Sequence, residues 1–130
     1  MCTAMTLQSK QSENFFGRTM DFSYDIDPEL YIVPKYYVRN NALNMHKSYN
    51  PYSFIGIGQE IDGILAFFDG VNEKGFAAAT LYFAGYAKYK TQSNYIDKEP
   101  ISSLDFLDYI LGRCGSVKEL KIGRASCRER

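Results

Sequence analysis

A cysteine next to the initiator methionine is the residue of this chain best suited to covalent chemistry. A small residue at position two allows an aminopeptidase to remove Met1, which would make Cys2 the first residue. Its thiol would then share a carbon with a free α-amino group, whose ordinary pKa of roughly 7.7–8.0 allows it to act as a base near neutral pH. One residue would therefore supply both nucleophile and base. The alternative is that Cys2 is a small apolar residue in an edge strand.

A short hairpin is expected to carry this cysteine. Residues 2–9 alternate between apolar and polar types and are rich in strand-forming residues, so they are predicted to form a strand. A second strand is predicted over residues 15–22. The polar turn between them is Gln11-Ser12-Glu13-Asn14. A turn centred near residues 11–13 places Cys2 across from residues 20–22.

Two charged residues would meet Cys2 at the open end of this hairpin. Arg18 lies in an otherwise apolar strand, and a buried guanidinium beside a thiol favours the thiolate. Asp21 could accept a hydrogen bond from the terminal ammonium and orient it. The alternatives are a solvated Arg18, or an Arg18 that serves only as a structural partner of Asp21.

Other polar residues give weaker signals. Tyr82 could present its hydroxyl or ring to a bound acyl group, or it could be a core tyrosine. Asn72 and Glu73 are predicted to form a turn. The three cysteines have no C-x-x-C spacing, and together with the single histidine they do not make a zinc site. The sequence also has no glycine-rich phosphate-binding loop. We therefore predict no metal and no cofactor.

Composition narrows the function classes. The 130 residues are 45% hydrophobic and 23% charged, as in a typical globular protein. Fifteen basic and fifteen acidic residues cancel, so we predict no nucleic-acid partner. No apolar run approaches the ~18 residues of a membrane span, and only Met1 precedes the cysteine, so we predict a cytoplasmic protein with no membrane partner.

The remaining elements indicate an α+β fold with a largely antiparallel sheet. Turn residues separate the apolar runs, and a polar stretch at 39–50 reads as a loop. A capping-box-like Ser102 and Asp105 predict a helix whose buried face carries Leu104, Leu107, Leu111 and Cys114. Ser116 and Glu119 predict the start of a second helix. The further strands are expected at residues 30–33, 52–58, 64–68 and 75–83, the last two joined by a turn over residues 69–75.

The chain divides unevenly into two parts. Residues 1–121 are predicted to be part of a single domain, because the sheet and one helix can bury only part of a core. Residues 122–130 lose the apolar pattern and become basic, and we interpret them as a non-native tail.

Three separated motifs resemble the choloylglycine hydrolase family, which comprises bile salt hydrolases and penicillin V acylases. They are Met1-Cys2-Thr3, Phe16-Gly17-Arg18-Thr19-Met20-Asp21-Phe22 and Asp69-Gly70-Val71-Asn72-Glu73-Lys74-Gly75. The resemblance covers residues 1–121. It implies the N-terminal half of an αββα sandwich of the N-terminal-nucleophile hydrolase type, and cleavage of linear amide C–N bonds in small-molecule substrates.

The resemblance also implies roles for residues. Cys2 would be the nucleophile and free-amine base, Arg18 and Asp21 its electrostatic partners, and Tyr82 a contact to the oxyanion or substrate. Bile salt hydrolases usually carry Asn where this chain has Tyr82, whereas penicillin V acylases carry Tyr. Our main hypothesis from sequence is therefore a penicillin V acylase-like hydrolase that needs no cofactor.

Three alternatives stay open at this point: a conjugated bile salt hydrolase, a non-catalytic binding module and a truncated product. Relatives are commonly homotetramers. They are also longer and supply a further Asn and a further Arg to the site. We therefore predict that the 130-residue chain alone is inactive.

Overall fold

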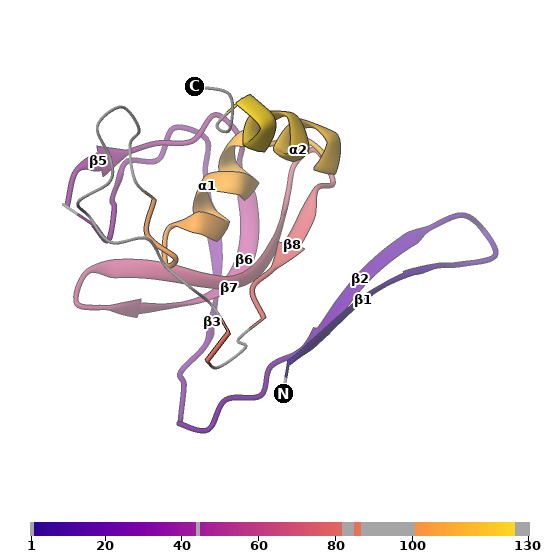
Figure 1. Ribbon diagram of the computed structural model, residues 1–130, viewed down its shortest axis with the longest axis horizontal. Coiled ribbons are helices and arrows are strands. Elements are labelled where there is room, and N and C mark those ends of the chain that lie inside the picture. Colours follow the sequence, from indigo (N-terminus) through magenta and orange to yellow (C-terminus); the bar gives the residue numbers. More distant parts are fainter. Residues whose placement is uncertain (1, 44, 82–84, 87–100, 127–130) are drawn as a thin grey trace.

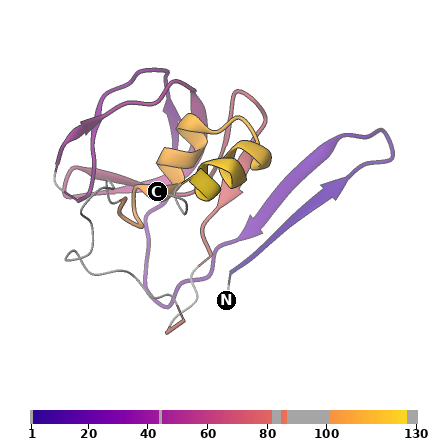
Figure 2. The same cartoon turned by 45° about the horizontal axis from the view of Figure 1, so that its top comes forward.

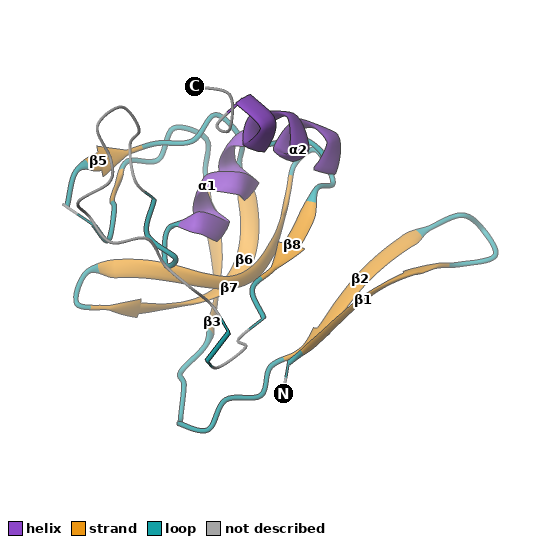
Figure 3. Cartoon of the chain, in the orientation of Figure 1, coloured by secondary structure: helices purple, strands orange, loops and turns teal. Residues whose placement is uncertain are grey.

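The computed structural model describes residues 2–43, 45–81, 85–86 and 101–126 of the chain, without the side chains of residues 122–126. Strands and helices are arranged in layers (Figure 1, Figure 3). All strand pairings among the described residues are antiparallel, which confirms the α+β class. The elements are β1 Thr3–Gln8, β2 Asn14–Thr19, β3 Glu29–Val33, β4 Arg39–Asn40, β5 Lys47–Ser48, β6 Phe54–Ile61, β7 Ile64–Asn72, β8 Ala77–Ala79, α1 Phe106–Arg113 and α2 Val117–Ser126.

The predicted hairpin is confirmed, with β2 ending at Thr19 rather than at residue 22. Its register pairs Thr3 with Thr19 and Gln8 with Asn14. The turn closes through the Ser9 amide, which donates to the Glu13 carbonyl oxygen at 2.8 Å. The hairpin extends away from the rest of the molecule in both views (Figure 1, Figure 2).

The central sheet has the order β3-β6-β7-β8, and α1 packs on one of its faces. Alternation along each strand sends every second side chain to this face. Aromatic rings from β6 and β7 meet there edge to face, with the Phe54 and Phe67 centroids 4.9 Å apart. The buried core consists of Val33, Phe54, Phe67, Phe76, Leu107, Ile110 and Leu111.

The opposite face of the same sheet points toward the hairpin. The register places Ile57 opposite Asp69 and Ile55 opposite Val71, so their side chains share this face. A cavity of about 1070 Å³ separates it from the hairpin residues around Thr6 and Phe16. The described residues therefore form two packed layers, α1 and the central sheet, with the projecting hairpin across a cavity from the other face of the sheet.

The start of α1 differs from the prediction. The helix begins at Phe106, and Leu104 is 51% exposed instead of lying on the buried face. The carboxylate of Asp105 accepts a hydrogen bond from the Ala42 amide at 2.9 Å, so it serves a tertiary contact rather than a capping box. A residue far away in the sequence overrides the local signal.

The second helix start is as predicted. Ser116 Oγ accepts the amide of Glu119 at 3.2 Å, and the Glu119 carboxylate accepts the amide of Gly115 at 2.8 Å. The helix continues through Ser126, so the boundary between residues 121 and 122 stays a prediction. Within the described part of the chain, no helix is long and apolar enough to cross a membrane.

Other predicted boundaries were wrong in instructive ways. β7 continues through residues 69–72, which the sequence assigned to a turn, because Gly70 lets α1 approach closely. A Cβ at Gly70 would lie 2.8 Å from Leu111 Cδ1. The turn itself is shorter and uses Gly75 at a φ of 78°. The loop over residues 39–50 contains the short strands β4 and β5.

Candidate active site

Cys2 lies at the open end of the hairpin, just before β1. The residue is buried, with 9% of its surface exposed. Its Sγ donates to the backbone oxygen of Asp21 at 3.6 Å, across the hairpin. The Thr3 amide donates to Thr19 Oγ1 at 3.1 Å and fixes the strand ends beside it. The sulfur is therefore held against the segment that follows β2, as the predicted register requires.

Arg18 lies on the same face of the hairpin as Cys2. Ala4 pairs directly with Arg18, and side chains two residues apart on a strand share a face. Cys2 and Arg18 are thus diagonal neighbours across the two strands, within reach of a long side chain. Only 6% of the Arg18 side chain is exposed. The buried Arg18 guanidinium and the Cys2 thiol therefore lie on the same face of the hairpin.

Two acceptors hold this guanidinium: Asp69 of β7 and Thr80, the residue directly after β8. Arg18 Nη2 donates to the Thr80 carbonyl oxygen at 2.7 Å, and Nη1 lies 3.7 Å from Asp69 Oδ2. Nε and Nη1 are buried and have no hydrogen-bond partner within the described ranges. Such unsatisfied donors are costly. They would stabilise an acceptor brought close to them.

Of the other two predicted site residues, the structure describes Asp21 but not Tyr82. Asp21 is an exposed residue that contributes its backbone oxygen to Cys2, and the role of its carboxylate stays a prediction. It also lines a hollow of about 380 Å³ together with Met20, Phe22 and Tyr24. Tyr82 lies outside the described residues.

Cys114 provides a contrast among the thiols. Burial, together with the nearby negative charge of Glu119, raises the pKa of the Cys114 thiol above its ordinary value. A thiol that resists ionisation is a poor nucleophile. The electrostatic surroundings thus favour Cys2 over Cys114 for covalent chemistry, because Cys2 has a guanidinium on its own face of the hairpin.

The sequence reasoning missed Asp69 and Thr80 as partners of Arg18. Thr80 is 62 residues from Arg18, so no local pattern links them. Asp69 was assigned to a turn, whereas it is a strand residue with a largely buried side chain, 17% exposed. Its one available signal was an acidic residue directly after the apolar stretch of residues 64–68. Groups of three or more metal-ligating side chains do not occur among the residues that the structure describes.

Comparison with known proteins assigns the chain to a family of hydrolases. The family of linear amide C–N hydrolases, choloylglycine hydrolase family, matches residues 2–123. A bile salt hydrolase/transferase from Lactiplantibacillus plantarum is 36% identical over 123 residues, which cover 93% of this chain and 36% of that protein. A bile salt hydrolase/transferase from Clostridium perfringens is 32% identical, with the same coverage of both chains. The chain belongs to the choloylglycine hydrolase family.

Solved structures agree with this assignment. The C2A variant of the conjugated bile acid hydrolase from Clostridium perfringens matches with a TM-score of 0.77 and 30% identity. Its R18L variant matches with a TM-score of 0.76 and 28% identity. The match covers 94% of this chain and 37% of theirs, so the chain spans a little over a third of these proteins. The predicted relation to the N-terminal part of an N-terminal-nucleophile hydrolase fold is confirmed.

Proposed function

We propose that this chain supplies the nucleophile of a hydrolase that cleaves the amide bond of conjugated bile salts. The observation that carries the proposal is the buried Arg18 guanidinium on the same hairpin face as Cys2. The named relatives are bile salt and conjugated bile acid hydrolases. The two solved variants concern a cysteine and an arginine with the same numbers as Cys2 and Arg18.

The proposed reaction is acyl transfer in two stages. After removal of Met1, the Cys2 thiolate attacks the amide carbonyl carbon, a C–S bond forms and the carbonyl oxygen becomes an oxyanion. The C–N bond then breaks, and the glycine or taurine amine leaves with a proton from the terminal ammonium. Water, deprotonated by the same amine, hydrolyses the thioester and regenerates the thiol.

Charge stabilisation divides among three groups in this proposal. Arg18 favours the thiolate before attack, and the Asp21 carboxylate orients the terminal ammonium. Tyr82 donates to the oxyanion, a contribution worth about 3 kcal/mol where such donors have been removed. Of these groups, Arg18 has the most developed geometric support, because its guanidinium is buried and anchored.

Penicillin V is the second candidate substrate. The residue that favours it is Tyr82, within Leu81-Tyr82-Phe83-Ala84-Gly85-Tyr86-Ala87. The comparisons lend more support to the bile salt alternative than to this main hypothesis from sequence, because the named relatives reported above are bile salt hydrolases. A cytoplasmic location and a homotetrameric assembly remain predictions.

We also propose that the 130-residue chain alone has little activity. Apolar side chains on the hairpin side of the central sheet are exposed, Leu30 by 63% and Ile32 by 75%. The longer relatives have almost two thirds of their length outside the match. An isolated chain with this exposed apolar surface is expected to unfold without clear cooperativity and to aggregate.

The test compares two polypeptides on the same substrates. The 130-residue chain and the product of the longest continuous reading frame that contains it are assayed on glycocholate, taurocholate and penicillin V. We expect the longer product to hydrolyse the two bile salts faster than penicillin V. Faster penicillin V hydrolysis would favour the second candidate. Hydrolysis of none of them, with a Cys2 no more reactive than an ordinary thiol, would leave the binding-module alternative.

A further inference from the structure

A bulge in the central sheet organises both partners of Arg18. Across β6 and β7 the register pairs Ile57 with Asp69 but Gly58 with Phe67, so Phe68 is an additional residue in β7. The amide and hydroxyl of Thr80 both bond to the carbonyl oxygen of this additional residue, at 2.8 and 3.2 Å. The bulge therefore fixes the chain at Thr80, whose own carbonyl accepts from Arg18.

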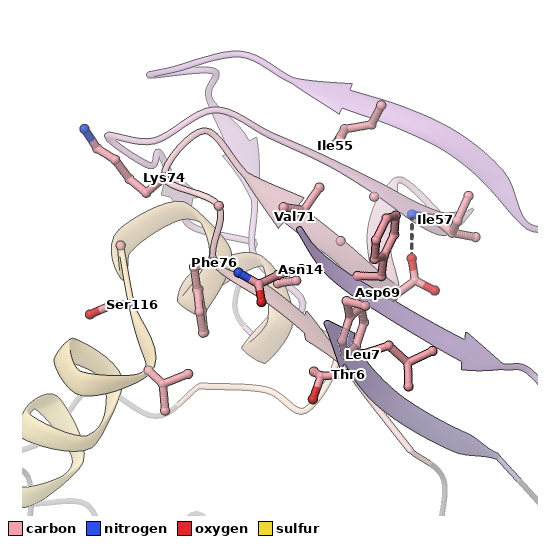
Figure 4. A pocket seen from close by; sticks show the side chains of 18 of the residues that line it. Thr6, Leu7, Asn14, Ile55, Ile57, Asp69, Val71, Lys74, Phe76 and Ser116 are labelled. Carbon is pink, nitrogen blue, oxygen red and sulfur yellow. Dashed lines mark hydrogen bonds between the residues drawn. The ribbon is translucent and has the colours of Figure 1, made fainter. Parts of the chain in front are cut away.

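The same bulge directs the carboxylate of Asp69. Its Oδ1 accepts the amide of Ile57 at 3.4 Å, and its Oδ2 is the atom near Arg18 Nη1. Figure 4 shows the Asp69 carboxylate bonded to Ile57 at the edge of the cavity between the sheet and the hairpin. One carboxylate thus bridges the backbone of β6 and the guanidinium on the hairpin.

We propose that Asp69 is a positioning residue that holds the Arg18 guanidinium on the Cys2 side of the hairpin. A buried cation without a counter-charge would move toward water, because desolvation of a charge is costly. The single bond to Thr80 leaves the guanidinium able to pivot, whereas a second contact through Asp69 fixes its plane. Asp69 acts on Cys2 through Arg18 and touches neither the sulfur nor the substrate.

This inference rests on the proposed function, in which Cys2 is the nucleophile, and its readout is the pH dependence of Cys2 alkylation. Among the described residues, the charged side chains placed at this end of the hairpin are Arg18, Asp69, and Asp21 and Asp25, which line one hollow; the terminal amine joins them after Met1 removal. Each variant is made in the longest continuous reading frame containing the sequence. Iodoacetamide labelling is followed on the peptide of residues 2–10 by mass spectrometry across a pH series, and circular dichroism reports the fold.

Asp69→Ala and Asp69→Asn are expected to raise the pH midpoint of Cys2 alkylation by about one unit, a tenfold loss of thiolate at a given pH. Asp69→Glu, which keeps the charge, is expected to restore the midpoint. If Asp69→Ala fails to fold, the comparison of Asp69→Asn with Asp69→Glu still tests whether the Asp69 carboxylate sets the midpoint. An unchanged or lowered midpoint in Asp69→Asn would overturn the proposal, because a carboxylate that merely opposes the Arg18 charge gives that result.

A double-mutant cycle separates positioning from a direct effect. Arg18→Leu should raise the midpoint by itself, and Asp69→Asn added to it should cause no further rise. An equal further rise would mean that Asp69 acts without Arg18, contrary to the proposal. Asp62→Asn, which removes a carboxylate in the turn between β6 and β7, is the matched control and should leave the midpoint unchanged. Alkylation of Cys114 in the same samples provides an internal reference.

The result is independent of substrate. A midpoint that follows Asp69 in a protein that hydrolyses no bile salt would support the positioning role and reject the proposed substrate. Bile salt hydrolysis by a protein whose Cys2 midpoint ignores Asp69 would reject the positioning role alone.

Discussion

The two faces of the central sheet have opposite characters. On the α1 face, Phe54 and Phe67 are each 3% exposed, and Leu111 of α1, which packs against them, is fully buried. On the hairpin face, Ile55 is 37% and Val71 is 40% exposed, beside a large cavity. Burial of apolar surface stabilises the first face at about 25 cal/mol per Å². The second face is joined to the hairpin through the polar contacts of Arg18 and has little apolar packing around it.

The same difference separates two buried polar residues. Asn72, on the α1 face, donates to the carbonyl oxygens of Leu111 and Cys114 at 2.8 and 2.7 Å. It also accepts the amides of Lys74 and Phe76, both at 3.0 Å. Its hydrogen-bonding capacity is therefore filled. Arg18, by contrast, keeps two buried donors, Nε and Nη1, without a hydrogen-bond partner in the described part of the chain.

Replacement of Cys2, the proposed nucleophile, should have the largest effect. In the product of the longest continuous reading frame that contains the sequence, Cys2→Ala is expected to lower bile salt hydrolysis about a thousandfold or more, because the covalent route is lost. The melting temperature should change little, since the residue is at the end of the hairpin and outside the α1 core. Activity is measured on taurocholate and stability by circular dichroism. Cys114→Ala is the control and should keep most of the activity; a Cys2→Ala enzyme of near-normal rate would contradict the assignment.

Loss of Asn72 should be the next largest effect, and it concerns stability. Asn72→Ala leaves two helix carbonyls and two turn amides unpaired, so we expect the free energy of unfolding to fall by about 3 kcal/mol. Urea titration of the longer product, which is expected to unfold cooperatively, measures this free energy. Asn14→Ala, an exposed site on the hairpin, should change stability by less than about 0.5 kcal/mol. A similar fall in the free energy of unfolding for both variants would show that Asn72 contributes no more to stability than an exposed hairpin residue.

The smallest effect is expected at the exposed ion pair of Glu73 and Lys35. The Lys35 ammonium, with help from the Ser53 hydroxyl, lowers the pKa of Glu73 from 4.5 to about 2. A lowered pKa means that the stabilisation is complete above about pH 4.5 and is lost as the pH falls toward 2. Glu73→Gln should therefore melt slightly below the parent protein above pH 4.5 and level with it near pH 2. A difference in melting temperature that grows as the pH falls would contradict the stabilising ion pair between Glu73 and Lys35.

Local patterns predicted the hairpin and the meeting of Cys2 with the segment around Asp21, because a short turn sets the register of both strands. The same kind of pattern failed at residues 69–72. Gly70 and Asn72 resemble turn residues, yet one is required by close packing of Leu111 and the other by buried helix carbonyls.

Long-range contacts explain what else was missed. The bulge at Phe68 becomes visible only when β6 and β7 are paired, and the contact from Arg18 to Thr80 spans 62 residues. Asp105 likewise faces Ala42 instead of capping its own helix. These contacts form only when the sheet and helix are assembled, so the sequence close to each residue does not predict them.

The most direct test of the account follows activity as Cys2 is alkylated. The product of the longest continuous reading frame is labelled with iodoacetamide, and the labelling is stopped at intervals. Modification of the peptide of residues 2–10 is measured by mass spectrometry, and taurocholate hydrolysis is measured on the same samples. We predict that activity falls in proportion to the unmodified Cys2 and that bound taurocholate slows both losses equally. Full activity after complete modification of Cys2 would contradict the central claim.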